Sequence, residues 1–312
     1  MYVSEHLDRA KNPLFSYEII PPYRGKSAKE LLQIVEQILP FEPPFIDVTS
    51  HTAEAYYEEL ENGMIKRHIR KKRPGTISLC GIIQNRYNID TVPHILCHGF
   101  TKEETEDVMI ELNFLGIHNV LAIRGDESNY RKPRNNGSVN YYAVDLVEQL
   151  VDLKKGKYLE NISNSEPIPV CIGVGGYPEK HYESPNIDID IRMLKKKVEA
   201  GAEYIVTQMF FDNKRFFDFV DRCRQEGINV PIIPGIKVLK TVNQLKNLPK
   251  FFHVNLPLPL VEEIQSNPKH VKEIGVNWTT KQCKELLEYG VNCIHFYIMN
   301  DASAVINVIK NL

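Results

Sequence analysis

The sequence predicts an α/β protein that forms a closed (β/α)8 barrel of the TIM type with extra helices, as a single domain over residues 1–312. Eight short apolar segments rich in valine, isoleucine and aromatic residues recur along the chain, and amphipathic helical patterns separate them. Such alternation favours a parallel sheet, and eight repeats favour a sheet that closes on itself. No linker, low-complexity segment or close repeat divides the chain.

The predicted strands mostly begin after glycine, proline or a polar turn. They are residues 14–20, 45–50, 92–99, 118–125, 169–177, 204–211, 230–236 and 293–300. Helices are expected over 28–39, 101–115 and 190–200, and Gly201 provides a stop for the last. Thr101 and Glu104 fit a capping box at the start of the second helix. Two connections exceed a plain repeat, 76–91 and 249–276, and the latter is expected to hold helices at 258–265 and 270–274.

Composition and charge exclude several classes of function. The formal charge of −2 argues against a nucleic-acid-binding protein, and the basic run over residues 66–73 is interpreted as a solvated helix end. No apolar run approaches the roughly 20 residues that cross a bilayer. The six cysteines form no CxxC pair and the first residues are polar, so a cytoplasmic protein with reduced cysteines and no leader is expected. His94, Cys97 and His98 alternate as in a strand, and no metal site is expected there.

Polar residues gather at the predicted carboxyl ends of the strands, where the active sites of such barrels lie. They are Glu18, Thr49, His94, Arg124, Gly125, Asp126, Tyr177 and Gln208. A buried polar group without a partner costs about 1–3 kcal/mol, so their concentration predicts a functional site. Taken singly, each also has a purely structural interpretation. Glu18 can pair with a buried base, His94 can be a core histidine, and Arg124 can form a local ion pair with Asp126.

At these positions the chain resembles the methylenetetrahydrofolate reductases along nearly its whole length. The motifs, in the family's order, are FSYEIIPP, IDVTS, PHILC, NVLAIRGD, YYAVDLV, GYPEKH, LKKKVEAGAEYIVTQMFFD, PIIPGI and IHFYIMN. The resemblance implies a (β/α)8 barrel that binds FAD and takes hydride from NADH or NADPH. It implies reduction of 5,10-methylenetetrahydrofolate to 5-methyltetrahydrofolate, which supplies methyl groups for methionine synthesis.

The resemblance also implies roles for individual residues. Glu18 matches the general acid, and Asp126 matches the carboxylate beside flavin and folate. Gln208 and Gln244 match substrate contacts, and Thr49 lies near the nicotinamide. The positions that match cofactor contacts are Thr49, Ser50, His94, Arg124, Gly125, Asp126, Tyr142, Ala143, Tyr177, His181, Asp190, Lys196 and Lys197.

The proposed chemistry requires two carboxyl groups with different tasks. The folate resists hydride until protonation of its bridging nitrogen opens the five-membered ring to an iminium cation, so the acid must be protonated near neutral pH. Burial raises the pKa of a carboxyl group, which suits Glu18 on an inner strand. Asp126 is expected to stay charged and stabilise the cation. Arg124, His181 and Lys197 are expected to hold the pyrophosphate of FAD.

Several positions depart from the family pattern. Asp301 stands where many relatives have arginine beside the folate, Met193 replaces a polar contact, Lys196 replaces arginine, and Leu248 replaces an aromatic residue. The choice between NADH and NADPH, the affinity for polyglutamate tails and the formation of a homo-oligomer stay open. Two alternatives also stay open: a flavin-binding partner subunit reduced by a companion protein, and a flavin barrel acting on a non-folate substrate.

Overall fold

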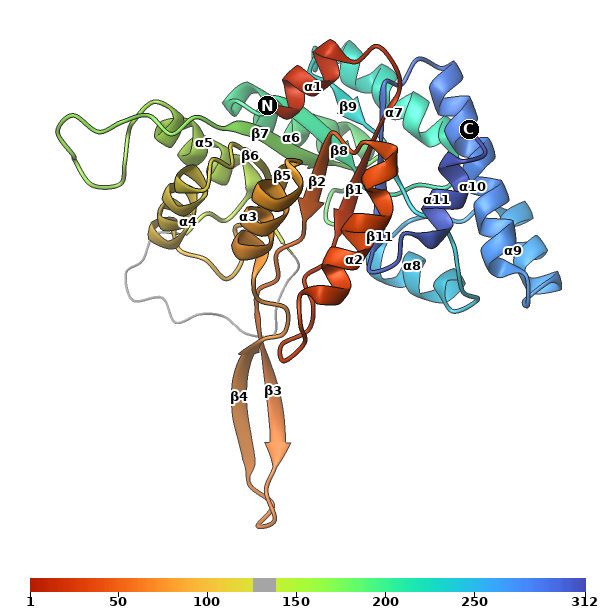
Figure 1. Cartoon of the computed structure of the whole chain (residues 1–312), viewed down its shortest axis with the longest axis horizontal. Coiled ribbons are helices and arrows are strands. Elements are labelled where there is room, and N and C mark those ends of the chain that lie inside the picture. The colour runs from red at the N-terminus through yellow and green to blue at the C-terminus, as the bar shows by residue number, and fades with distance from the viewer. Residues whose placement is uncertain (126–138) are drawn as a thin grey trace.

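A parallel sheet closed into a barrel forms the centre of the computed structural model, which describes residues 1–125 and 139–312 (Figure 1). Its strands are β1 (Leu14–Ile19), β2 (Phe45–Val48), β5 (Asp90–Leu96), β6 (Asn119–Ile123), β7 (Cys171–Gly176), β8 (Tyr204–Thr207), β9 (Ile232–Ile233), β10 (Gly235–Ile236) and β11 (Cys293–Met299). Their order in the sheet is β10-β11-β1-β2-β5-β6-β7-β8-β9. The predicted parallel barrel is confirmed.

The barrel closes at one short segment. β9 and β10 stand at opposite ends of the sheet order, yet in the chain only Pro234 separates them. β9 pairs with β8 and β10 pairs with β11, so the two act as a single barrel strand that changes its neighbour at the proline. Pro234 has no amide hydrogen to give to a ladder. Its carbonyl oxygen still accepts a 2.9 Å hydrogen bond from the amide of His295 on β11.

Helices surround the sheet and bury their apolar faces against it (Figure 1). They are α2 (Lys29–Ile38), the 3-10 helix η1 (Leu39–Phe41), α3 (Thr76–Tyr87), α4 (Lys102–Phe114), α5 (Ala143–Lys154), α6 (Ile187–Ala200), α7 (Asn213–Gln225), α8 (Gln244–Phe252), α9 (Leu258–Ser266), α10 (Val271–Glu288) and α11 (Ser303–Ile309). Among the described residues, none of the helices has the length and apolar character needed to span a membrane.

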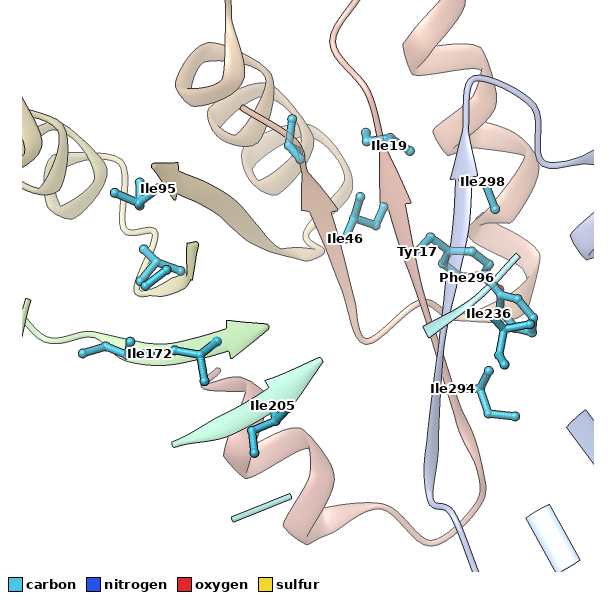
Figure 2. Close-up of a cluster of buried hydrophobic side chains, with 14 of the residues drawn as sticks. Tyr17, Ile19, Ile46, Ile95, Ile172, Ile205, Ile236, Ile294, Phe296 and Ile298 are labelled. Atoms are coloured by element: carbon cyan, nitrogen blue, oxygen red, sulfur yellow. The ribbon is translucent and has the colours of Figure 1, made fainter. Parts of the chain in front are cut away.

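Two apolar layers lie on the two sides of the barrel wall. The outer layer packs alternate strand residues against the helices, and Figure 2 shows Ile46, Ile172 and Phe296 among its members. The inner layer fills the amino-terminal end of the barrel, where Phe45 and Tyr204 are fully buried. Helix α1 (Val3–Arg9) covers this end with Val3 and Leu7. The inner layer leaves the carboxyl end of the barrel for polar groups.

Helix boundaries follow local signals, with two corrections. In the confirmed capping box before α4, the Thr101 amide donates to Glu104 Oε2 at 2.9 Å, and the Glu104 amide donates to Thr101 Oγ1 at 3.1 Å. α6 starts before the predicted residue 190, because Asn186 accepts a hydrogen bond from the amide of Ile189. α10 continues to Glu288 where only 270–274 was predicted, because its buried positions continue to Leu286.

The predicted helix end over residues 66–73 is wrong. This segment forms β4 (Ile65–Lys71), which pairs antiparallel with β3 (Ala53–Glu59) in a hairpin that projects from the barrel (Figure 1). Its turn holds Asn62 and Gly63, the latter with φ +76°, an Asn-Gly pair typical of hairpins that the charge of the run concealed. On one face of the hairpin, cross-strand pairs offset the basic charge: His68 lies 2.7 Å from Glu58, and Arg70 lies 3.1 Å from Glu54.

The hairpin is anchored at its base to the loop that leaves β1. The side chain of Arg24 donates to the carbonyl oxygen of Lys71 at 3.0 Å, and its amide donates to that of Lys72 at 2.8 Å. In the opposite direction, Arg73 donates to the carbonyl oxygen of Pro21 and stacks over the ring of Tyr23. The first residues after β1 are therefore braced by the ends of the hairpin.

Two glycines of β7 allow a test of packing inside the barrel. A Cβ atom on Gly173 would lie 2.2 Å from the ring of buried Tyr204, whereas a Cβ on Gly175 would meet only ordinary contacts at 3.9 Å. We expect Gly173→Ala to lower the free energy of unfolding by about 1–3 kcal/mol, because Tyr204 must move in a full interior. The matched variant Gly175→Ala should change it by less than about 0.5 kcal/mol. Urea unfolding of both variants measures the difference; equal losses would contradict this account.

Candidate active site

Four inward-facing titratable side chains meet inside the barrel, between the apolar inner layer and the carboxyl ends of the strands. Strand register brings them together, since Glu18 on β1 pairs with Asp47 on β2, and Ser16 on β1 pairs with His295 on β11. His94 on β5 lies two residues beyond the partner of Asp47, on the same face of the sheet. All five residues are buried, each less than 9% exposed. The barrel therefore encloses a polar layer next to its apolar inner layer, on the side of the carboxyl ends of the strands.

The imidazole of His94 lies between two carboxyl groups. Its Nε2 atom is 3.5 Å from Oε2 of Glu18 and 3.4 Å from Oδ2 of Asp47. On the other side of Asp47, Nδ1 of His295 lies 3.9 Å from Oδ1 and 2.9 Å from the hydroxyl of Ser16. These approaches to the carboxyl groups are too long or too poorly directed for hydrogen bonds. Within the described part of the chain, both carboxyl oxygens of Asp47 and Nε2 of His94 form none.

Burial decides the protonation of this cluster. It raises the pKa of Glu18 to about 7, with a further rise from Asp47 against the lowering effects of His94 and Lys237. Burial likewise raises the pKa of Asp47 to about 7, although His295 acts in the opposite direction. The pKa values of both imidazoles are lowered, again by burial first. The cluster therefore holds neutral imidazoles and retains protons on its acids up to about neutral pH.

A cationic group lies across the mouth, at the carboxyl end of β7. Lys197 on α6 reaches back to the sheet, and its ammonium donates to the carbonyl oxygen of Gly175 at 2.6 Å. Burial lowers its pKa to about 8, against the favourable charge of Asp190. Asp190 in turn accepts from the amide of His181 at 3.0 Å, and the ring of His181 lies edge-on to Tyr177 at 4.7 Å. One helix and one strand end thus bring four predicted residues together.

Arg124 anchors the turn after β6. Its Nε atom donates to His98 Nε2 at 3.1 Å, its Nη1 atom forms an ion pair with Glu183, and its guanidinium lies 5.6 Å from the centre of the Tyr142 ring. Tyr142 is the N-cap residue of α5, which begins at Ala143. Gly125 has φ +83° and would meet Leu96 at 3.4 Å if it carried a Cβ, so glycine suits this turn. Asp126 lies outside the described residues.

The other predicted residues lie on the rim or are engaged in local contacts. Thr49 is buried after β2 with its hydroxyl 3.2 Å from His51, and Ser50 follows it, half-buried. The Gln208 side chain accepts from the amide of Met209, and that of Gln244 accepts from the amides that precede α8. Lys196 is exposed one position before Lys197, about 100° around the helix. Their functional roles stay predictions.

The departures from the family pattern have structural consequences. Asp301 forms a 2.9 Å ion pair with Lys240 and accepts two hydrogen bonds from Ser303, and these contacts hold the pKa of its carboxyl well below the ordinary range despite the opposing effect of burial. Leu248 is buried in the small apolar cluster of α8 to α10, whereas Met193 is 37% exposed. The negative charge at residue 301 is therefore paired with a lysine.

Three residues of the site were not predicted from the sequence: Asp47, His295 and Lys237. Asp47 lies two residues before Thr49, and His295 lies within its strand. Both are therefore away from the strand ends where site residues were expected. Alternation along the strand was the available signal, because inward positions recur every second residue. Lys237 follows β10, and its ammonium donates to the carbonyl oxygen of Tyr297 at 3.1 Å. Burial lowers the Lys237 pKa to about 8.

Comparisons with known proteins give a consistent family. A family model described as methylenetetrahydrofolate reductase matches residues 3–312. Methylenetetrahydrofolate reductase 1 of Schizosaccharomyces pombe is 30% identical over 311 residues, which cover 98% of this chain and 47% of the yeast protein. The 5,10-methylenetetrahydrofolate reductase of Buchnera aphidicola is 30% identical over 302 residues, which cover 95% of this chain and 91% of the bacterial protein. The chain thus spans about half the length of the eukaryotic relative.

Solved structures support the barrel fold. An uncharacterized protein from Clostridium thermocellum that binds two copies of 5-methyl-5,6,7,8-tetrahydrofolic acid aligns with a TM-score of 0.57 at 13% identity, over 98% of this chain and 96% of that one. A 2,3-dimethylmalate lyase aligns with a TM-score of 0.52 at 8% identity, over 99% and 82% of the two chains. At such identities the likeness shows the fold alone.

Replacement of Asp47 by asparagine should alter stability in a pH-dependent way. Because the Asp47 pKa rises from 3.8 to about 7 on folding, the native protein keeps a proton that the unfolded chain loses between those values. The stability of the native protein relative to Asp47→Asn should therefore fall across this window, by at most about 1.4 kcal/mol per pH unit, and level off above it. Urea unfolding of both proteins from acid to mildly alkaline pH measures this. A difference that does not vary with pH would contradict the buried acid.

Proposed function

Since the chain belongs to the methylenetetrahydrofolate reductase family, we propose that it reduces 5,10-methylenetetrahydrofolate to 5-methyltetrahydrofolate. FAD would be the bound cofactor, NADH or NADPH the hydride donor, and residues 1–312 one catalytic domain. The product would supply methyl groups for methionine synthesis in the cytoplasm. The observation that carries the proposal is the buried Glu18 carboxyl on the inner barrel wall, 3.5 Å from His94, with a pKa raised to about 7.

Glu18 has the properties that the proton-transfer step needs. A carboxyl group with an ordinary pKa is almost fully ionised at neutral pH, whereas Glu18 remains substantially protonated there. Its O–H bond would break as its proton passes to the bridging nitrogen of the folate, whose ring then opens to the iminium cation. Neutral His94 beside it adds no positive charge to repel that cation. The Clostridium thermocellum protein, which shares the fold, binds a reduced folate of the same class as the proposed product.

The residues at β6, β7 and α6 fit the proposed cofactor. Bound FAD would accept hydride from the nicotinamide and deliver it to the folate carbon. Lys197 is a half-buried ammonium whose hydrogen bond goes to a backbone carbonyl, so it retains donors for a phosphate oxygen. Arg124 lies at the neighbouring strand end, and Tyr142 presents a half-exposed ring beside it. Asp126 is proposed as the charged carboxylate of the site on the strength of the family pattern.

Glu18→Gln should abolish folate reduction while leaving bleaching of the bound flavin by NADH or NADPH nearly unchanged. Glutamine cannot donate the proton that opens the folate ring, and general acid catalysis contributes typically 10²–10⁴-fold. Stopped-flow absorbance follows the two half-reactions separately. Glu36→Gln makes the same chemical change at an exposed position on α2 and serves as the control. Equal losses in both half-reactions would assign Glu18 a structural role.

The purified protein should release FAD on heat or acid extraction, identified by chromatography. Lys197→Met removes the ammonium while keeping the chain length, and should weaken FAD retention at least about tenfold, because hydrogen bonds to charged groups contribute about 1.5–3 kcal/mol. Lys195→Met on the same helix, whose lysine pairs with Glu199, is the matched control. Recovery of FMN alone, or of no flavin under any purification, would overturn the cofactor proposal. Oxidation of NADH or NADPH by the isolated chain separates a reductase from a partner subunit.

A further inference from the structure

The environment of Glu18 contains one acid that the proposed reaction does not use. Asp47 is fully buried, and both of its carboxyl oxygens lack hydrogen bonds within the described residues. A buried carboxylate normally accepts several hydrogen bonds or pairs with a cation, because the unpaired charge costs several kcal/mol. Asp47 instead lies beside His94 at 3.4 Å and His295 at 3.9 Å. The burial of Asp47 is therefore not explained by hydrogen bonds that support the fold.

Asp47 is the neighbour of Glu18 whose charge disfavours ionisation of the Glu18 carboxyl group. The groups that face Glu18 are Asp47 from β2, His94 from β5, Tyr297 from β11 and Lys237 after β10. Positive charge on His94 or Lys237 favours the ionised form of Glu18, and the Tyr297 phenol donates to the carbonyl oxygen of Thr207 at 2.6 Å. Among these described neighbours, Asp47 alone opposes ionisation of Glu18. Two carboxyl groups that share one imidazole do not readily carry two negative charges.

We propose that Asp47 is a positioning residue that keeps Glu18 protonated between turnovers, acting across Nε2 of His94 and flanked on its other side by His295, which the Ser16 hydroxyl fixes. This inference rests on the proposed role of Glu18 as the proton donor. After Glu18 gives its O–H proton to the substrate nitrogen, its carboxylate faces Asp47 across His94 and regains a proton from water at the barrel mouth. Asp47 touches neither substrate nor cofactor in this account.

The register of the sheet places Asp47 between Glu18 and His295. Ser16 and Glu18 project from the same face of β1, and the hydroxyl of Ser16 fixes Nδ1 of His295 at 2.9 Å. His295 is itself fixed through its amide, which donates to the carbonyl oxygen of Pro234 at the barrel closure. A continuous series of side chains therefore crosses four strands within the barrel interior: Ser16, His295, Asp47, His94 and Glu18. Replacement of any of these side chains should change the midpoint of Glu18 ionisation.

Asp47→Asn tests the proposal directly, because it removes the ionisable carboxyl group while keeping the shape. The ionisation of Glu18 is followed in the purified protein by the infrared band of its protonated carboxyl group, identified by its absence in Glu18→Gln. We expect the midpoint to move to lower pH by about one unit, so that the ratio of protonated to ionised Glu18 at a given pH falls about tenfold. Folate reduction should slow by the same factor above the native midpoint and recover below it, with flavin bleaching by the nicotinamide unchanged.

Two further variants keep the test decisive. Val92→Ala shortens a buried inner side chain of β5 two residues before His94, and should lower stability without moving the Glu18 midpoint. Ser16→Ala should move the midpoint in the same direction as Asp47→Asn but by less, and it replaces the main test if Asp47→Asn does not fold. An unchanged or raised midpoint in the folded variant would overturn the proposal. If the midpoint moves but the native protein does not reduce 5,10-methylenetetrahydrofolate, the effect of Asp47 on Glu18 stands and the proposed function fails.

Discussion

Closure of the sheet at Pro234 is the constraint on which the rest of the molecule depends. A barrel seam made of two two-residue strands, one facing β8 and the other facing β11, is the minimum that removes both open edges. It also puts Gly235 where a side chain would collide with Thr207 and Tyr297, so Tyr297 can lie across the interior. Because the wall is complete, the inward positions of β1, β2, β5 and β11 are shielded from water. That shielding, more than any single charge, raises the pKa of Glu18.

The barrel mouth is divided electrically into two halves. On the side of β1, β2 and β5, burial suppresses charge and leaves acids protonated beside neutral imidazoles. On the side of β6, β7 and α6, the side chains of Arg124 and Lys197 present cationic groups beside Glu183 and Asp190. The two halves suit different parts of one reaction, proton donation on the first and retention of an anionic cofactor on the second. Because the strands are parallel, their carboxyl ends lie at the same end of the barrel, so both groups belong to one mouth.

Much of this architecture could be predicted from the sequence, because it is written in local patterns. Strand alternation, the capping box at Thr101 and the polar strand ends depend on neighbours in the chain, and the structure contains them. The hairpin was not predicted, although Asn62 and Gly63 are a pair typical of hairpin turns, because the charge of the following residues suggested a helix end. Alternation could have placed Asp47 and His295 on the inward face of their strands, but their proximity to Glu18 and His94 depends on the register between strands, which one sequence does not specify. Contacts such as Lys240 with Asp301 depend on tertiary geometry alone.

The β3–β4 hairpin leaves and re-enters the barrel at adjacent points, since Ala53 and Lys71 are paired neighbours. Such an insertion adds length without changing the separation of the strands that flank it. A change at the tip of the hairpin should therefore not alter the barrel. Its base is different, because Arg24 and Arg73 tie it to the segment that follows Glu18. The tip is therefore a natural place for a graft or a label, whereas the base is part of the scaffold that sets where the segment after β1 can go.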